Sequence, residues 1–475
     1  MTTKPYVSGH YTPVVDEITA HELTVHGTIP PELSGRYFRN GHNPKPGHTP
    51  THWFKGSGMI HGLRLRGGRA EWYRNRWVHT PALAGVPYMG ADGIPNLKAS
   101  DAATHVIEHA GRILALQEVN LPYEMTPELD TVGAYDFGGR LKTAMTAHPK
   151  TDPVTGELHF FGYGPFPPYL TYYVADAKGD IVRSEVVDGA GPSLMHDFGI
   201  TAGHVIWLDL PVVFNPAEQS GIPYRWSDTY TPRIGVMPRT GPARVRWFEV
   251  EPGALLHVAN AYEDERGRIV LSGPRYDRGA WEQTWKWWIG APGYAPQPMV
   301  GATGHRWVLD PATGTASEEA VDDLVTEFPT INEDMTGLPN RFSYSVAFPG
   351  PDLNEYAIAK HDHTTGVREL VPMGRGRMPG EAVFVAAEGG TREDDGYLLT
   401  VVSDLDRDAS QLLILDASAP AGRPVATVEL PRRVPAGIHG SWIADADIEA
   451  TNDTDNHTDI NTDINTDINT EDGAA

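Results

Sequence analysis

Short apolar runs alternate with turn residues along almost the whole chain. Ten runs, each bounded by Gly, Pro, Asp or Asn, cover residues 68–80, 111–119, 156–164, 171–187, 203–213, 244–250, 267–273, 355–370, 396–404 and 410–417. Strands of about five residues that recur every 8–12 residues are typical of a sandwich, barrel or propeller. Almost no stretch repeats its apolar positions with helical spacing. The pattern therefore predicts an all-β fold.

Length and composition decide how these strands are grouped. The chain has 475 residues and no change of composition before residue 444, so we expect a single domain over 1–443, and the number of strands favours a propeller. Residues 444–475 hold ten acidic residues and no Lys or Arg, and they include the low-complexity stretch HTDINTDINTDINTED. Because its isoleucines are too sparse to form a core, we expect a disordered acidic tail. A Ca²⁺-binding repeat is the alternative, although the glycine turns of such loops are missing.

Charge and cysteine content exclude several classes of function. The formal net charge is −24, which disfavours nucleic acid and anionic membrane surfaces as partners. Without any cysteine, disulfides, zinc–thiolate sites and thiol catalysis are ruled out. No signal peptide or bilayer-spanning stretch is recognisable, so we expect a cytoplasmic protein with no obligate protein partner.

Four histidines share one sequence context. His148, His196, His257 and His439 each follow a short apolar segment in a turn-rich stretch. After the first three, a strand begins 10, 9 and 12 residues later, so they occupy the same place in successive hairpins. In a propeller such positions converge on the central axis, which predicts a four-histidine metal site. Neutral imidazoles suit Zn, Cu, Fe or Ni, and ligand softness does not choose among them.

Imidazole ligands are usually oriented by a carboxylate on the second ring nitrogen. Three glutamates in apolar surroundings at strand ends are candidates for this role, namely Glu118, Glu327 and Glu381. A solvated or locally paired surface position is the competing interpretation of each.

Eight motifs in order resemble the carotenoid cleavage oxygenase family. They are RYFRNGHNP (36–44), GSGMIHGLRL (56–65), AHPKTDPVTGE (147–157), MHDFGIT (195–201), HVANAYE (257–263), EFPTIN (327–332), GEAVFV (380–385) and RVPAGIHG (433–440). The resemblance implies a seven-bladed propeller whose loops form a cap over one axial Fe(II) per subunit. It implies His148, His196, His257 and His439 as ligands, with Glu118 paired to His196, Glu327 to His257 and Glu381 to His439. It further places Thr104 where a side chain crowds one open position of the iron.

The same resemblance implies the chemistry, with alternatives left open. We expect a dioxygenase that uses O₂ to cleave a conjugated C=C bond of an apolar carotenoid or apocarotenoid into two carbonyl products. The alternatives are a phenolic stilbene as substrate, retinoid-type isomerisation, and a non-catalytic propeller that serves as a binding platform. Two departures concern the substrate tunnel: Gln117 stands where the stilbene-cleaving branch has Lys, and Leu256 where Phe is common.

Other polar and aromatic clusters have simpler interpretations. His361 and His363 have the spacing of metal ligands but lie in KHDHTTGVREL, which predicts an exposed hairpin, and His61 is expected in the core. The aromatic stretches 160–173 and 281–288 favour core packing. Tunnel lining or transient peripheral contact with a membrane, from which substrate would be extracted, is the alternative for both.

Overall fold

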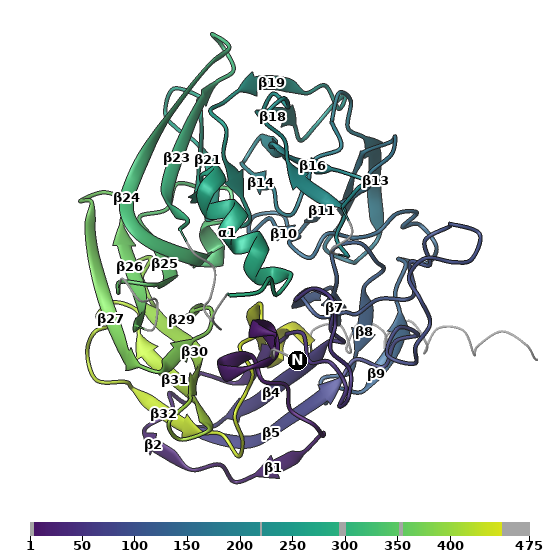
Figure 1. The fold of residues 1–475 in the computed structure, drawn as a ribbon. Coiled ribbons are helices and arrows are strands. Elements are labelled where there is room, and N and C mark those ends of the chain that lie inside the picture. The colour runs from purple at the N-terminus through teal and green to yellow at the C-terminus, as the bar shows by residue number, and fades with distance from the viewer. Residues whose placement is uncertain (1–3, 219–220, 294–300, 351–354, 449–475) are drawn as a thin grey trace, which may run out of the picture.

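The computed structural model describes residues 4–218, 221–293, 301–350 and 355–448. Within these ranges β-strands dominate, and every one of the ten apolar runs contains at least one strand. The sheets stand around a common centre (Figure 1). The predicted mostly-β class is therefore confirmed.

The sheets of the first half of the chain are built largely from strands that are consecutive in sequence and antiparallel. The first sheet contains β1 (Thr19–His21), β5 (Arg69–Trp77), β4 (Met59–Arg66), β3 (Gly35–Arg39) and β33 (Gly440–Ala444). The second contains β6 (His105–His109), β7 (Arg112–Leu116), β8 (Tyr123–Met125) and β9 (Thr131–Ala134). The third contains β10 (Lys150–Thr151), β11 (Leu158–Tyr163), β12 (Leu170–Ala175) and β13 (Ile181–Val186). The fourth contains β14 (Gly199–Ile200), β15 (His204–Asp209), β18 (Arg233–Pro238) and β19 (Arg246–Glu249), and a hairpin beside it contains β16 (Val212–Phe214) and β17 (Tyr224–Trp226).

The second half holds two larger sheets. One contains β20 (Ala254–Leu255), β21 (Asn260–Glu263), β22 (Ile269–Tyr276), β23 (Thr303–Asp310), β24 (Thr315–Thr330), β25 (Phe342–Ala347), β26 (Glu355–Asp362) and β27 (Val367–Arg375). The other contains β2 (Val25–Gly27), β32 (Ala426–Glu429), β31 (Ala409–Asp416), β30 (Gly396–Asp404), β28 (Arg377–Pro379) and β29 (Val383–Ala386). The long strand β24 pairs with β23 through its first part and with β25 through its last part, and the register shifts between Glu327 and Thr330.

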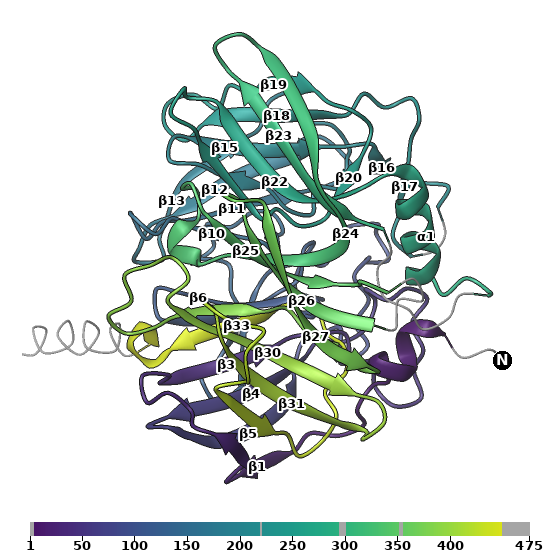
Figure 2. The same cartoon turned by 90° about the vertical axis from the view of Figure 1, so that its left-hand side faces the viewer.

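Burial follows position within a sheet. In the third sheet the central strand β12 is buried along its whole length, whereas the edge strand β13 alternates between buried or half-buried and exposed residues. A central strand is covered on both faces, so all its side chains are buried, while an edge strand exposes every second side chain. The two ends of the chain also interlock, because C-terminal β33 pairs with β3 and N-terminal β2 pairs with β32 (Figure 2).

One α-helix occurs in the described part of the chain, α1 (Arg278–Trp288), and strand-based reasoning did not predict it. Asp277 caps it by accepting a hydrogen bond of 2.8 Å from the backbone N–H of Ala280. Trp281, Trp285 and Trp288 recur at helical spacing and are buried, so the aromatic stretch 281–288 forms core, as expected. Three 3-10 turns complete the elements: η1 (Pro5–Val7), η2 (Gly9–Tyr11) and η3 (Glu333–Met335). No helix in the described ranges is long and apolar enough to cross a membrane.

The expected domain boundary after residue 443 needs correction. Strand β33 continues to Ala444, and the next residues form a helical turn beside the first sheet. Asp445 pairs with Arg36 and Arg64, and Ile448 is buried. Packed structure therefore extends to 448, because an acid with two buried arginine partners is held as firmly as a strand. The remainder of the predicted tail lies outside the described residues.

Candidate metal centre

Each of the four histidines lies just before a short strand that begins or ends a sheet. His148 precedes β10, His196 precedes β14, His257 precedes β21, and His439 directly precedes β33. These strands lie at the centre of the ring of sheets (Figure 1). Equivalent places in four sheets therefore deliver four imidazoles to one region.

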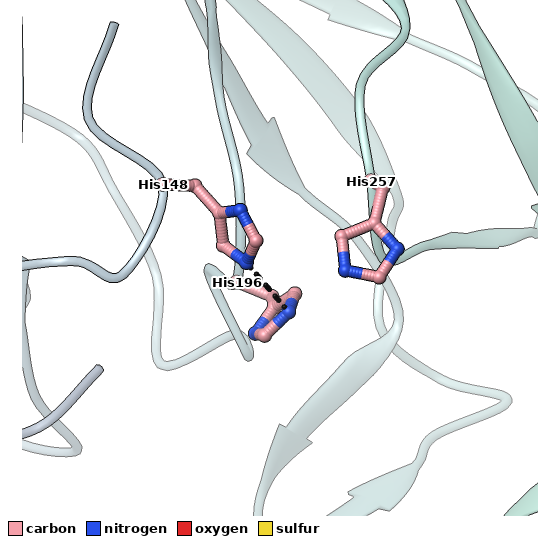
Figure 3. A group of neighbouring side chains, drawn as sticks. All are labelled: His148, His196 and His257. Atoms are coloured by element: carbon pink, nitrogen blue, oxygen red, sulfur yellow. Dashed lines mark hydrogen bonds between the residues drawn. The ribbon is translucent and has the colours of Figure 1, made fainter. Parts of the chain in front are cut away.

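The imidazoles face one another at short range. Nitrogen atoms of His148, His196 and His257 all lie within 4.8 Å of one another (Figure 3). The Nε2 atoms of His148 and His196 are 3.0 Å apart. The ring centroid of His439 lies 4.7 Å from that of His148 and 4.9 Å from that of His257. All four rings thus surround one small volume, with three of them forming the tightest group.

The donor set fits a metal ion. The Nε2 atoms of His257 and His439 are buried and have no hydrogen-bond partner in the structure. A buried polar nitrogen without a partner is costly, and a cation coordinated by its lone pair removes that cost. The four nitrogens suit an intermediate transition metal, and neither thiolate nor carboxylate contributes to the set.

Three of the histidines are oriented by buried or half-buried glutamates in the expected pairs. The Nδ1–H groups of His196 and His257 donate to Glu118 and Glu327 across 2.6 Å each, and that of His439 donates to Glu381 across 3.0 Å. A proton held on Nδ1 leaves the Nε2 lone pair free and aimed at the centre. These carboxylates therefore decide the tautomer and the direction of each ring.

Burial sets the charge state of the cluster. Burial, reinforced by the neighbouring histidines, holds the pKa of His148 and of His439 well below the usual range. Burial alone would raise the pKa of Glu327, but His257, Tyr276 and the N–H of Phe328 outweigh it, so the pKa of this carboxyl is lowered. Neutral imidazoles beside an ionised carboxylate are the protonation states that metal ligation requires.

The remaining predicted positions lie close to these rings. The carbonyl oxygen of buried Thr104 accepts a hydrogen bond of 3.3 Å from the backbone N–H of His439. The Thr104 hydroxyl donates to Oε1 of Gln117 across 3.2 Å, and that same oxygen accepts from the N–H of Ala103. Leu256 is buried next to His257 in the large cluster that also holds Trp281 and Phe328. Gln117 is thus tied to the strand start that carries Thr104.

Sequence reasoning missed several side chains of the site. Tyr163 donates its hydroxyl proton to Glu118, and Tyr276 donates to Glu327 across 2.7 Å. The ring of Phe328 stacks on His257 with centroids 5.2 Å apart, and its backbone has a φ of +54°. His105, next to Thr104, lies 5.1 Å from the ring of His439, and burial lowers its pKa to about 4. Tyr163 and Phe328 stand inside stretches already singled out as aromatic or motif-like, yet only the fold brings them to the histidines.

The other histidines lie elsewhere. His61 is buried and its Nδ1 lies 2.7 Å from the hydroxyl of Tyr73, as expected for a core position. His361 and His363 stand at the β26–β27 hairpin, where they contact Asp322 and Ser343 and are half-buried, not exposed as predicted. The pair does not take part in the central cluster.

Comparison with known proteins identifies first the class and then the family. The chain is an oxygenase enzyme, since its curated relatives carry that activity in their names. Residues 11–444 match the family described as retinal pigment epithelial membrane protein. The chain belongs to this family, the carotenoid cleavage oxygenases.

Individual relatives cover nearly the whole chain. It is 37% identical to a carotenoid cleavage oxygenase of Mycobacterium tuberculosis, over 92% of this chain and 97% of the relative. It is 33% identical to the carotenoid 9,10(9',10')-cleavage dioxygenase 1 of Arabidopsis thaliana, over 94% and 90%. Among solved structures, cobalt-substituted apocarotenoid oxygenase of Synechocystis matches with a TM-score of 0.79 and 26% identity, over 92% and 98%. The lignostilbene dioxygenase of Pseudomonas brassicacearum matches with a TM-score of 0.80 and 26% identity, over 93% and 98%.

Proposed function

We propose that this protein is an Fe(II)-dependent dioxygenase that cleaves one conjugated C=C bond of a carotenoid or apocarotenoid. Both atoms of O₂ enter the products, so the bond is replaced by two carbonyl groups and no external reductant is needed. The observation that carries the proposal is the convergence of His148, His196, His257 and His439 on one buried volume, with two Nε2 atoms lacking any partner.

One iron per subunit is the metal that best joins this donor set to the family's chemistry. Imidazole ligands admit several divalent ions, and an oxygenase needs one that reacts with O₂. The cobalt-substituted form of the Synechocystis relative supports a divalent ion in the corresponding fold. Bound there, the iron would supply activation of O₂ towards an electron-rich polyene.

The protein's own residues hold and enclose that centre. Glu118, Glu327 and Glu381 orient three of the rings through their Nδ1–H groups. The phenyl ring of Phe328 covers His257 and limits access of water from that side. Thr104, whose carbonyl binds the backbone of His439, is the side chain that we assign to crowding one open position beside the rings.

A seven-bladed propeller is the architecture that we propose for the mostly-β fold. The eight-stranded sheet divides into two blades at β24, whose partner changes from β23 to β25 at the register shift. Together with the four sheets of the first half and the C-terminal sheet, this division makes seven. A cap would consist of α1, the N-terminal turns and the β16–β17 hairpin; the packing of Tyr11 on Trp287, with centroids 4.9 Å apart, supports it.

Substrate choice favours a polyene over a phenolic stilbene. The similarity to a lignostilbene dioxygenase keeps the stilbene as second candidate. A phenol needs a fixed polar partner, and here the Gln117 oxygen already accepts hydrogen bonds from Ala103 and Thr104. A long polyene is held by buried apolar area, at roughly 25 cal/mol per Å². Isomerisation and a non-catalytic binding role are outcomes that product analysis separates from cleavage.

The substrate also bears on location. Exposed apolar side chains gather in two loops: Val86, Met89 and Ile94 in one, and Phe166, which is 68% exposed, in the other. Such side chains support transient peripheral contact of a cytoplasmic enzyme with a membrane that stores apolar substrate.

Product analysis tests the proposal. The Fe(II)-loaded protein, incubated in air with carotenoids, apocarotenoids and hydroxystilbenes, should convert a polyene into two aldehydes or ketones. Incubation under ¹⁸O₂ should label both carbonyls. An unchanged panel with iron bound would contradict the enzyme, and recovery of a geometric isomer would replace cleavage by isomerisation.

A further inference from the structure

The carboxylate of Asp197 lies directly after His196 and is 1% exposed. Its Oδ1 accepts a hydrogen bond of 2.7 Å from the N–H of Phe198 and lies 2.9 Å from the ammonium of Lys150. Its Oδ2 accepts a hydrogen bond of 2.7 Å from the N–H of Val258. Both oxygens of this buried acid are therefore used, and its partners come from segments of three separate sheets.

The partners stand next to the other histidines of the cluster. Lys150 is two residues beyond His148 on β10, and Val258 directly follows His257. Asp197 itself directly follows His196. A single carboxylate thus joins the three chain segments that carry the tightest group of imidazoles. No other described acid has hydrogen-bond or ion-pair partners adjacent to two of these histidines while neighbouring the third in sequence.

We infer that Asp197 is a positioning residue that fixes the spacing of His148, His196 and His257, and with it the affinity and coordination geometry of the metal. The inference rests on the proposed metal site. The glutamates rotate individual rings, whereas Asp197 sets the distances between the segments on which the rings are mounted. A shift of a few tenths of an ångström in one segment moves its Nε2 by a comparable amount, which is the tolerance of a metal–nitrogen bond.

Charge makes the contact with Lys150 part of the same device. Four neutral imidazoles leave the full charge of a divalent cation in place, and an ammonium two residues from a ligand would repel it. The Asp197 carboxylate neutralises that ammonium. Loss of the carboxylate therefore removes a geometric tie and exposes the metal to a positive charge, whereas loss of the ammonium removes the tie to the His148 segment alone.

Asp209 provides a matched control in the same sheet. It is buried at the end of β15, accepts a hydrogen bond of 2.6 Å from the Tyr230 hydroxyl and pairs with Arg233 across 2.7 Å. Its partners do not adjoin the central histidines. Asp209→Asn therefore reproduces the loss of a buried paired carboxylate without touching the metal segments.

The test is titration of the metal-free full-length protein with Co²⁺, following the visible spectrum, alongside its melting temperature. We expect Asp197→Asn to bind Co²⁺ at least 10-fold more weakly than the parent and with a changed spectrum. Lys150→Met should weaken binding about 3–10-fold. Asp209→Asn should lower the melting temperature but keep affinity within twofold.

The outcomes separate the metal site from the positioning role. Failure of the parent protein to bind Co²⁺ would overturn the metal site itself. Parental affinity and spectrum in folded Asp197→Asn would overturn the positioning role and leave the site standing. Should Asp197→Asn fail to fold, Lys150→Met decides, because it keeps Asp197 and both backbone hydrogen bonds. Parental Co²⁺ binding by that variant would overturn the inference.

Discussion

The Nε2 atoms of His148 and His196 lie 3.0 Å apart in a largely buried cluster. The Nδ1–H of His196 is engaged by Glu118, so in the neutral ring Nε2 carries a lone pair and no proton. Two neutral rings in this arrangement can share one proton between their Nε2 atoms, and His257 and His439 then remain without any partner for theirs. A central cation satisfies all four nitrogens at once, which is why the contact indicates a metal centre rather than a hydrogen-bonded core.

Removal of one imidazole should abolish metal binding while the fold survives. His257→Ala leaves the sheets intact, because their cores are formed by apolar clusters away from the rings. We expect iron content and oxygen-dependent turnover to fall to background, with a melting temperature close to that of the metal-free parent. His363→Ala, at the β26–β27 hairpin, is the control and should keep both. Full iron occupancy in His257→Ala, measured by elemental analysis, would refute the ligand assignment.

Replacement of an orienting carboxylate should cost less than loss of a ligand. Glu327→Gln keeps the shape of the side chain, but one of its oxygens becomes an NH₂ group that cannot accept from His257 or Tyr276. Loss of such an outer partner typically costs about 10–100-fold in metal affinity or activity. Glu318→Gln is the control, since Glu318 forms a similar pair with His305, 2.9 Å apart and outside the site. Equal iron affinity and rate in the two variants would show that Glu327 does not act on the metal.

Two truncations should separate the tail from the folded domain. Deletion of residues 449–475 should leave iron content and turnover unchanged, as expected for an acidic solvating segment. Deletion from 445 onward also removes the partner of Arg36 and Arg64, and the loss of a buried ion pair costs on the order of 3 kcal/mol. Chemical unfolding of both proteins measures the difference. A tenfold loss of turnover in the shorter deletion would reveal a function of the tail.

Gln117 should control the balance between polyene and stilbene. We expect the parent protein to cleave a carotenoid or apocarotenoid and to show little turnover of a hydroxystilbene. Gln117→Lys supplies an ammonium that donates a charge-assisted hydrogen bond to a phenol, and it removes the acceptor of the Thr104 hydroxyl. The ratio of kcat/KM for the two substrates should shift towards the stilbene. Gln117→Met, which removes the same acceptor without adding charge, is the control; an equal shift in both variants would exclude the charge as the cause.

Much of the site could be predicted from local pattern alone. The recurrence of His148, His196 and His257 at one place in successive hairpins is a property of the chain, because each sits a similar distance ahead of a strand. Strand signals are equally local, since alternation, β-branched residues and turn residues act over a few positions. The four Trp residues of 281–288 misled this reasoning, because aromatic residues favour strands as well as buried helices, and the cap by Asp277 decides between them.

Contacts between segments far apart in the chain could not be deduced in this way. The partnership of Tyr276 with Glu327, the stacking of Phe328 on His257 at a positive φ, and the tie from Asp197 to Lys150 and Val258 all join distant segments or depend on a register shift. The structured end at Ile448 has the same origin, since Asp445 looks like tail sequence until Arg36 and Arg64 are placed beside it. Local sequence specifies which residues can form strands and carry ligands. Packing of the sheets around one centre selects which distant side chains meet, because that choice depends on the geometry of the whole ring.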